Sequence, residues 1–213
     1  MMRILVTAGP TREYIDSVRF LSNASSGITG YQIAAAGMKL GHRMTLISGP
    51  VSLKPPTGVE LVHVVSTDQM YRACMRHFPR VDAVIMTAAV CDYRPEKQAQ
   101  HKLKKTPGPM TLRLLPTPDI LSELGRRKRP GQILIGFALE DRKPKISAKA
   151  KVDRKNLDAI VLNSPAAIGN VRNKVNVYHS SRWHAWPEMS KQALGRRLIC
   201  LTEHLFVTDQ NKE

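Results

Sequence analysis

The sequence predicts an α/β fold: a Rossmann-like, doubly wound sheet of mostly parallel strands. Short apolar runs of strand length recur along the chain and are separated by segments with helical periodicity. Residues 82–90, DAVIMTAAV, are apolar throughout, as strands covered on both faces are. Strands that alternate with helices form parallel βαβ units. The 213 residues show no internal repeat and no linker, so residues 1–213 are expected to form one domain.

The first half of the chain contains four expected strands and two expected helices. Apolar runs bounded by Gly, Pro and Asp give the strands, and the helical segments begin after polar residues that can cap them. The elements, in order, are a strand at 4–6, a helix from 25–27 to 40–42, strands at 44–50 and 59–65, a helix capped by Thr67 or Asp68, and the strand at 82–90.

The second half begins with an irregular segment, residues 91–109, rich in charge, Pro and Gly. Such a segment at the carboxyl end of a strand is typical of a flexible flap over a site. The remaining expected elements are a strand at 110–115, a helix from 116–120 to 125, a strand at 132–139, a basic helix at 145–156, a strand at 157–163, a hairpin at 174–178 and 183–186, an amphipathic helix at 190–206 and a loose tail at 208–213.

A long polar loop joins the first strand to the first helix. It carries Arg12, Asp16, Arg19 and Asn23 and is far longer than the usual βα connection. In an open α/β sheet, ligands bind outside the carboxyl ends of the strands. The free N–H groups of the following helix, which begins near Ser25-Ser26-Gly27, suit a phosphate. We therefore expect a phosphate-binding site here.

The charge balance is strongly basic. The chain has 33 Lys and Arg against 17 Asp and Glu, a net charge of +16. Such a field attracts nucleotides, phosphorylated metabolites and nucleic acid alike. The basic residues are spread along the chain, and no known nucleic-acid module is present, so a basic nucleic-acid-binding protein remains only an alternative.

The cysteines and the apolar runs suggest where the protein works. Cys74, Cys91 and Cys200 are widely separated and form no C-x-x-C pair, which favours a reducing compartment and disfavours a zinc site. No apolar run approaches the length of a membrane span, and no signal-like segment opens the sequence. A cytoplasmic protein is expected.

A nicotinamide-dependent reductase is the second alternative that this fold raises. The first turn lacks the full G-x-G-x-x-G pattern, since only Gly27 and Gly30 fit part of it. The second strand ends in Ser48-Gly49, where an NAD site needs an acidic residue for the ribose. Both absences disfavour this class.

Six motifs, in order, resemble the phosphopantothenate–cysteine ligase family, also called phosphopantothenoylcysteine synthetase, in its bacterial, stand-alone form. The resemblance covers nearly the whole chain. The motifs are TAGPTREYID with VRF and SNASSG between residues 7 and 27, AAVCDYRP at 88–95, KLKK at 102–105, TPDIL at 117–121, GFALED at 136–141, and KNLDAIVLN at 155–163.

The resemblance implies a reaction in coenzyme A biosynthesis. The family joins 4′-phosphopantothenate to the amino group of L-cysteine through an acyl-nucleotidylate. In bacterial members CTP supplies the nucleotidyl group and gives CMP and pyrophosphate, with ATP not excluded here. Mg²⁺ is expected because it screens a triphosphate. Such a site must bring two anions together, which requires cations and N–H donors more than an acid or a base.

The same resemblance implies roles for individual residues. Asn23 and Lys102 are the expected catalytic residues, with Asn23 donating a hydrogen bond to an oxygen that gains charge. The expected phosphopantothenate-binding residues are Asn23, Ser25, Ser26 and Gly27. The expected nucleotide-binding residues are Ala88, Ala89, Asp92, Lys102, Asp119, Phe137, Lys151 and Lys155. Asp92 is also the candidate for a Mg²⁺ ligand.

The family also implies partners. Its members are homodimers that share residues across the interface, and the hairpin at 174–186 is a candidate for that contact. Many bacterial members are fused to a flavin-dependent decarboxylase, which is expected here to be a separate protein. The sequence departs from the family pattern at Tyr14, at Ile28-Thr29, where a lysine is common, at Cys91 and at Thr117, where an asparagine is common.

Overall fold

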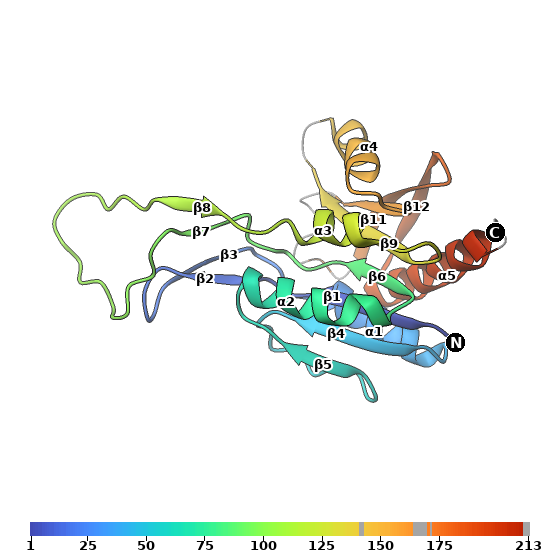
Figure 1. The fold of residues 1–213 in the computed structure, drawn as a ribbon, viewed down its shortest axis with the longest axis horizontal. Helices are drawn as coiled ribbons and strands as arrows, with labels where there is room; N and C mark the ends of the chain where they lie inside the picture. The colour runs from blue at the N-terminus through green and yellow to red at the C-terminus, as the bar shows by residue number, and fades with distance from the viewer. Residues whose placement is uncertain (141–142, 164–169, 171, 211–213) are drawn as a thin grey trace.

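The computed structural model describes residues 1–140, 143–163, 170 and 172–210. An eight-stranded sheet with the order β12-β11-β10-β9-β6-β1-β4-β5 forms its centre (Figure 1). Six neighbouring strands, β10 to β5, are parallel, and β11 and β12 add an antiparallel hairpin at one edge. The predicted doubly wound, mostly parallel fold is confirmed. The strands are β1 (Arg3–Ala8), β4 (Arg43–Ser48), β5 (Glu60–His63), β6 (Ala83–Met86), β9 (Ile133–Leu139), β10 (Ala159–Asn163), β11 (Arg172–His179) and β12 (Arg182–Ser190).

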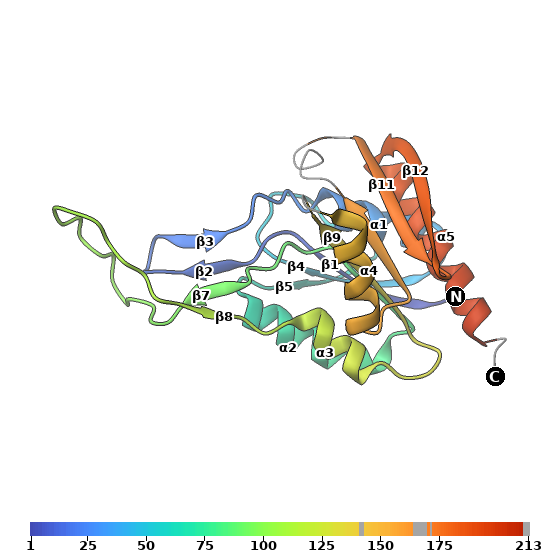
Figure 2. The ribbon, with the colours of Figure 1, turned by 90° about the horizontal axis from the view of Figure 1, so that it is seen from above.

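Helices cover both faces of the sheet (Figures 1 and 2). On one face α1 (Ile28–Lys39) and α5 (Lys191–Gln210) pack on a buried cluster that includes Ile33 and Leu198. On the other face α2 (Thr67–His77), α3 (Ile120–Arg127) and α4 (Pro144–Arg154) pack on a second cluster, and a short 3-10 turn, η1 (Phe78–Arg80), follows α2. No helix among the described residues is long and apolar enough to cross a membrane.

The helices α1 and α5 lie in close contact although they are far apart in sequence. A β-carbon at Gly195 would lie 2.7 Å from the carbonyl oxygen of Gln32, so only glycine allows this approach. Strand β12 runs parallel to β1, because β11 is antiparallel to both β12 and β10 while β10 is parallel to the central strands. Helix α5 follows β12 directly, and α1 follows β1 after the long loop that contains β2 and β3. Both helices therefore begin at the carboxyl edge of the sheet and run in the same direction.

The start of α2 corrects one prediction. Ser66, and neither Thr67 nor Asp68, is the N-cap: its hydroxyl accepts from the Gln69 N–H at 3.3 Å, while the Gln69 side chain accepts from the Ser66 N–H at 3.3 Å. This reciprocal arrangement is a capping box, whose signature is Ser followed three residues later by Gln. Thr67 and Asp68 form the first turn of the helix.

The strand expected at residues 82–90 is shorter than its apolar run. Strand β6 ends at Met86, and residues 87–90 continue as irregular backbone beside the end of β1. The Thr87 hydroxyl donates to the Thr7 carbonyl at 2.6 Å, and the Ala89 N–H donates to the Gly9 carbonyl at 2.9 Å. These contacts satisfy the backbone without a regular ladder, which periodicity alone does not reveal.

Two small hairpins form an arm that extends from the sheet. Strands β2 (Arg12–Tyr14) and β3 (Phe20–Ser22) pair with each other, as do β7 (Tyr93–Pro95) and β8 (Leu114–Pro116). In both ribbon views the arm, residues 12–22 and 93–116, projects well beyond the helices (Figures 1 and 2). The strand expected at 110–115 is therefore only the short β8. The loose tail was expected from residue 208, but α5 continues to Gln210. Residues 211–213 and Asp141 of the GFALED motif lie outside the described residues.

Candidate functional site

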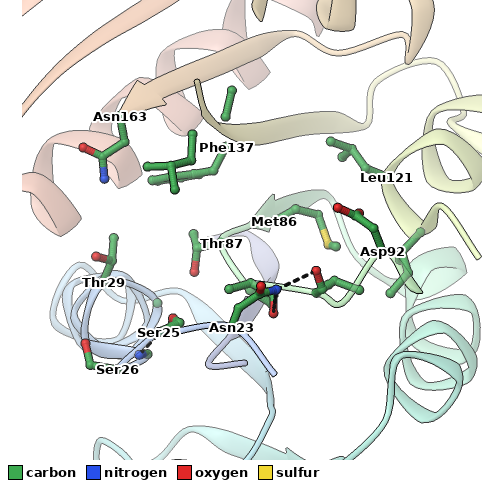
Figure 3. Close-up of a pocket in the computed structure, with 18 of the residues that line it drawn as sticks. Asn23, Ser25, Ser26, Thr29, Met86, Thr87, Asp92, Leu121, Phe137 and Asn163 are labelled. Atoms are coloured by element: carbon green, nitrogen blue, oxygen red, sulfur yellow. Dashed lines mark hydrogen bonds between the residues drawn. The ribbon is translucent and has the colours of Figure 1, made fainter. Parts of the chain in front are cut away.

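A cleft of about 560 Å³ opens at the carboxyl edge of the sheet. In a doubly wound fold this edge is where ligands bind. The cleft has two ends (Figure 3). The α1 end comprises Ser25, Ser26, Gly27, the first turn of α1, Asn163, Asn173 and Lys191. The α3 end comprises Asp92, residues 117–121 and Lys155, and residues 86–90, Asn23 and Phe137 lie between the two ends.

The first turn of α1 has no side-chain cap. Its N-cap is Gly27, with φ 75°, and the first turn contains no acidic residue. A β-carbon at Gly27 would lie 3.2 Å from the backbone of Gly9, so a larger residue would be strained in both conformation and space. Ser25, Ser26 and Gly27 line the cleft as predicted, and the N–H groups of this turn present a positive dipole end to it.

Asn23 connects the loop before α1 with the loop after β6. Its Nδ2 donates to the carbonyl oxygens of Ala89 at 3.1 Å and Val90 at 2.9 Å (Figure 3). Sequence reasoning predicted that this amide donates to the substrate. In the structure both of its hydrogens are directed at backbone carbonyls, so Asn23 also holds the two loops together. The predicted Ala88, Ala89 and Asp92 line the same part of the cleft.

Cys91 fixes the position of the loop after β6 through hydrogen bonds of its backbone. It is buried, and its N–H donates to the Thr11 hydroxyl at 2.8 Å. The hydroxyls of Thr67 and Thr117 both donate to the Cys91 carbonyl, at 3.3 and 2.6 Å. Burial raises the pKa of the Cys91 thiol, which keeps it neutral and unreactive. Thr117, which replaces the asparagine common in related sequences, therefore has a clear structural contact.

Asp119 and Lys155 form an ion pair at the α3 end. Asp119 caps α3 by accepting from the Ser122 N–H at 3.0 Å, and Lys155 Nζ lies 2.8 Å from its carboxylate. Burial raises the pKa of Asp119, but the hydrogen bonds from Lys155 and Ser122 outweigh it, so the net pKa lies below its ordinary value. The structure brings these two predicted nucleotide-binding residues together, and the predicted Phe137 lines the same cleft.

Two predicted lysines do not line the cleft. Lys151 of α4 forms an ion pair with Glu140, and neither residue is among those lining the cleft. Lys102 is exposed on the arm, next to Leu103. The arm is held there because the Asp16 carboxylate accepts from the Leu103 N–H at 3.1 Å and Arg19 donates to the Leu103 carbonyl at 2.9 Å. In this structure the predicted flap does not lie over the cleft, and the contact between Lys102 and a nucleotide stays a prediction.

Several residues of the cleft escaped the sequence reasoning. The most informative is Lys191, the first residue of α5, which lines the cleft and is only 6% exposed. Its position directly after a strand, at the carboxyl edge of the sheet, was the available signal that it lines the cleft. Because it opens an amphipathic helix, the sequence pattern instead indicated a surface residue. The other missed residues that line the cleft include Thr29, Met86, Thr87, Leu121, Asn163 and Asn173.

The cleft offers a limited set of metal ligands. Among the described residues there is no group of three or more His, Cys, Asp or Glu side chains that can hold a metal ion. Two carboxylates line the cleft in the described residues, Asp92 and Asp119, and Asp119 is already paired with Lys155. Mg²⁺ commonly uses one or two carboxylates together with substrate phosphates and water, so this arrangement fits a metal that arrives with a nucleotide.

Comparisons with known proteins agree with one another. The profile of the family described as "DNA/pantothenate metabolism flavoprotein C-terminal domain" matches residues 1–205. The "Coenzyme A biosynthesis bifunctional protein CoaBC" of Bacillus subtilis (strain 168) is 48% identical over 167 residues, 78% of this chain and 41% of that protein. The protein of the same name from Vibrio parahaemolyticus is 44% identical over 202 residues, 92% of this chain and 51% of that protein.

A solved structure extends the likeness to the fold. The crystal structure of the C-terminal domain of a coenzyme A biosynthesis bifunctional protein CoaBC superposes with a TM-score of 0.85 at 39% identity, covering 97% of this chain and 96% of that one. The present chain spans about half the length of the curated relatives that it matches.

Proposed function

Because the chain belongs to the DNA/pantothenate metabolism flavoprotein C-terminal domain family, which is the phosphopantothenoylcysteine synthetase family of the motifs above, we propose that it is a phosphopantothenate–cysteine ligase. The observation that carries this proposal is the two-ended cleft. An uncapped helix start faces one end, and a partly buried lysine paired with a carboxylate lies at the other. Such a cleft suits two anionic substrates bound side by side.

The α1 end is proposed to bind the phosphate of 4′-phosphopantothenate. Ser25, Ser26 and Gly27 offer hydroxyl and N–H donors, and the positive end of the helix favours a dianion. This orientation directs the pantothenate carboxylate away from α1 and toward Asn23 and the loop after β6.

The α3 end is proposed to bind CTP. Lys155 supplies a positive charge and Asp119 an acceptor for amino or hydroxyl groups, while Phe137, between the two ends, supplies an apolar surface. Asp92 would hold a Mg²⁺ that arrives with the triphosphate and screens its charge. CTP is preferred to ATP because the sequence motifs resemble those of bacterial members.

The chemistry requires positioning more than proton transfer. A carboxylate becomes a good electrophile only after conversion to a mixed anhydride, and the amine of cysteine then acts as the nucleophile. The chain must hold the carboxylate and the α-phosphorus within reaction distance, which reduces the entropic part of the barrier. Asn23 lies between the two ends of the cleft, where its amide can exchange a backbone carbonyl for an oxygen that gains charge.

Lys102 can take part in the proposed reaction only if the arm moves or if a second copy of the chain supplies its own Lys102. It is exposed on the arm and does not line the cleft of its own chain. For Lys102 to contact the triphosphate, the arm must close over the cleft, or a second copy must supply its own arm. A homodimer that shares residues across its interface provides the second route, and Lys151 would likewise have to leave Glu140 to reach a nucleotide.

The decisive assay measures pyrophosphate release from the purified protein. Release is expected only when CTP, phosphopantothenate and Mg²⁺ are present together, and addition of L-cysteine should then convert the intermediate to phosphopantothenoylcysteine with CMP. Replacing CTP with ATP at equal concentration should lower the rate. If pyrophosphate release does not depend on phosphopantothenate, the ligase proposal is wrong; equal turnover with ATP would contradict only the CTP assignment.

A further inference from the structure

We propose that Asp16 is a positioning residue for the reaction: through Leu103 it holds Lys102 of the arm in the orientation in which this lysine meets the nucleotide. The role of Lys102 toward a triphosphate rests on the proposed function, whereas the contact between Asp16 and Leu103 can be tested without it. We call the Asp16 carboxylate, the Arg19 side chain and the backbone of Leu103 the clamp.

The Asp16 carboxylate accepts hydrogen bonds on both of its oxygens. Its Oδ1 accepts from the N–H groups of Val18 and Arg19, both at 2.8 Å. Its Oδ2 accepts from Arg19 Nε at 2.9 Å, from Arg19 Nη2 at 2.6 Å and from the Leu103 N–H at 3.1 Å. The first oxygen therefore fixes the turn between β2 and β3, and this turn directs the second oxygen at Leu103.

These contacts keep Asp16 ionised and fully occupied. Its side chain is inaccessible to solvent, and the hydrogen bonds from the backbone and side chain of Arg19 hold the pKa of Asp16 well below its usual range. A carboxylate offers about four lone-pair sites, so Asp16 has no capacity left to pair with a lysine. The clamp is electrically neutral, and it leaves the positive charge of Lys102 available to a phosphate.

Leu103 anchors an otherwise exposed segment. Residues 100–111 are all exposed, and none of them belongs to a helix or a strand. Over the described part of the chain, two hydrogen bonds tie this segment to the rest of the protein, and both are made by Leu103: its N–H donates to Asp16, and its carbonyl accepts from Arg19 Nη2 at 2.9 Å. The peptide groups on both sides of Leu103 are therefore held. The flanking Lys102 and Lys104 are positioned by the same two contacts.

The clamp should matter for binding because it orders the backbone beside Lys102 in advance. A flexible segment loses conformational freedom when it binds a ligand, and this loss opposes binding. A segment that is fixed beforehand loses less. Residues 97–111 contain no Asp or Glu, so no carboxylate of this segment competes with a phosphate for Lys102. Asp16 itself touches no substrate and acts through Leu103.

Hydrogen exchange at the Leu103 amide tests the clamp without any substrate. Asp16→Asn can keep the oxygen that fixes the turn, whereas its NH₂ group replaces the oxygen that accepts from Arg19 and Leu103. Exchange of the Leu103 N–H should become about 10- to 100-fold faster, the factor that corresponds to loss of one charge-assisted hydrogen bond. Glu96→Gln is the matched control with the same change in charge. It breaks an ion pair with Arg113 on the same arm and should leave the Leu103 exchange unchanged.

A second pair of variants removes the same contact from the other side. Leu103→Pro deletes the N–H that donates to Asp16. Leu103→Ala is its control, because it keeps both backbone groups and shortens only an exposed side chain. If Asp16→Asn does not fold, this pair takes its place: Leu103→Pro should weaken binding of CTP, and Leu103→Ala should not.

Steady-state kinetics then test whether the clamp acts through Lys102. Asp16→Asn should raise KM for CTP by about 10-fold and leave KM for phosphopantothenate nearly unchanged, because it alters the arm and not the cleft. In a Lys102→Met background the same substitution should add little, since residues that act as one unit are not additive. A role of Asp16 in overall folding would instead lower the melting temperature and affect both substrates alike.

The outcomes separate the clamp from the proposed function. Leu103 exchange in Asp16→Asn at the wild-type rate overturns the clamp, as does wild-type affinity for CTP in Leu103→Pro. An effect on CTP that is just as large in the Lys102→Met background overturns the positioning role, because Asp16 would then act by another route. A wild-type protein without ligase activity, in which the Leu103 exchange still depends on Asp16, contradicts the proposed function and leaves the clamp standing.

Discussion

The α1 end and the α3 end of the cleft differ in how their charges are balanced. The α1 end combines an uncapped helix start with the buried Lys191, for which the described residues supply no ion-pair partner, and has no carboxylate in the first turn of α1. The α3 end has its charges already matched, since Asp119 caps its helix and pairs with Lys155. Helix α1 thus begins without a side-chain cap, whereas the start of α3 is capped and its charges are matched within the chain. Asn23 lies between them and holds the connecting loops.

Replacing the residue between the two ends should give the largest effect. Asn23→Ala removes a preorganised donor, and such a loss typically lowers the rate by ~10²–10³. It also removes two hydrogen bonds to the loop after β6, so the melting temperature should fall as well. Turnover, the dissociation constant of CTP and the melting temperature should be measured on one preparation.

Asn23→Asp provides the matched comparison for that variant, because it keeps the size of the side chain and removes its N–H donors. Lower turnover in both variants, with CTP binding retained, is the expected result. If both variants are less stable yet the folded protein keeps wild-type turnover, Asn23 only holds the loops together and has no part in catalysis.

The α1 end can be disturbed without touching a charge. A β-carbon at Gly30 would lie 2.5 Å from that of Ala8 and 2.7 Å from the Thr87 hydroxyl, so Gly30→Ala should push α1 away from β1. Overpacking of this kind costs about 1–3 kcal/mol, against a gain of about 0.5–1 kcal/mol from removing a helical glycine. Denaturant unfolding should show net destabilisation and weaker stabilisation by phosphate.

Gly37→Ala is the control for that experiment. It lies in the same helix, and its β-carbon would meet the flexible end of the Met44 side chain, which can move. Gly37→Ala should therefore be tolerated better than Gly30→Ala. Equal effects of the two variants would show that the contact between α1 and β1 is not what positions the helix start.

The smallest expected effect is at the α3 end. Asp119→Ala removes an N-cap, which costs about 0.5–2 kcal/mol, while Asp119→Asn keeps a good N-cap and removes only the charge. The pKa of Asp119 is lowered from its ordinary value of 3.8, so the folded protein favours the ionised form. Its charge contributes stability above pH 3.8, and the contribution is lost as the pH falls through the lower, folded-state pKa.

The difference in unfolding free energy between wild type and Asp119→Asn should therefore shrink as the solution is acidified below that value. Urea titrations at several pH values measure this directly. A difference that does not change with pH would mean that the pair with Lys155 contributes nothing to stability, and the α3 end would then be no more organised than the α1 end.

Sequence patterns predicted the strands and helices of this fold better than the loops that connect them. The apolar runs located the parallel strands, because burial on both faces leaves a signal in every residue. The irregular backbone after Met86 depends on hydrogen bonds to Thr7 and Gly9, which lie about eighty residues away and leave no local pattern. The direction of the arm depends likewise on Asp16 and Leu103.

The residues of the candidate site were also predicted only in part. Motifs located Asn23, Ser25, Asp92 and Asp119, all of which line the cleft. Lys191 was missed because a lysine at the start of an amphipathic helix reads as a surface residue. Only the packing of Gly195 against α1 shows that this helix start is enclosed. The partner of a side chain is a property of the fold, and periodicity does not report it.

The contact between Gly195 and Gln32 also has a consequence for the order of folding. It joins segments separated by most of the chain, and such long-range contacts form late because the intervening loop must first be closed. During synthesis the α3 end can assemble while α5 is still inside the ribosome. The α1 end cannot, since its buried cation arrives with α5. A newly made chain would thus complete the α3 end of the cleft first and the α1 end only when the last helix docks.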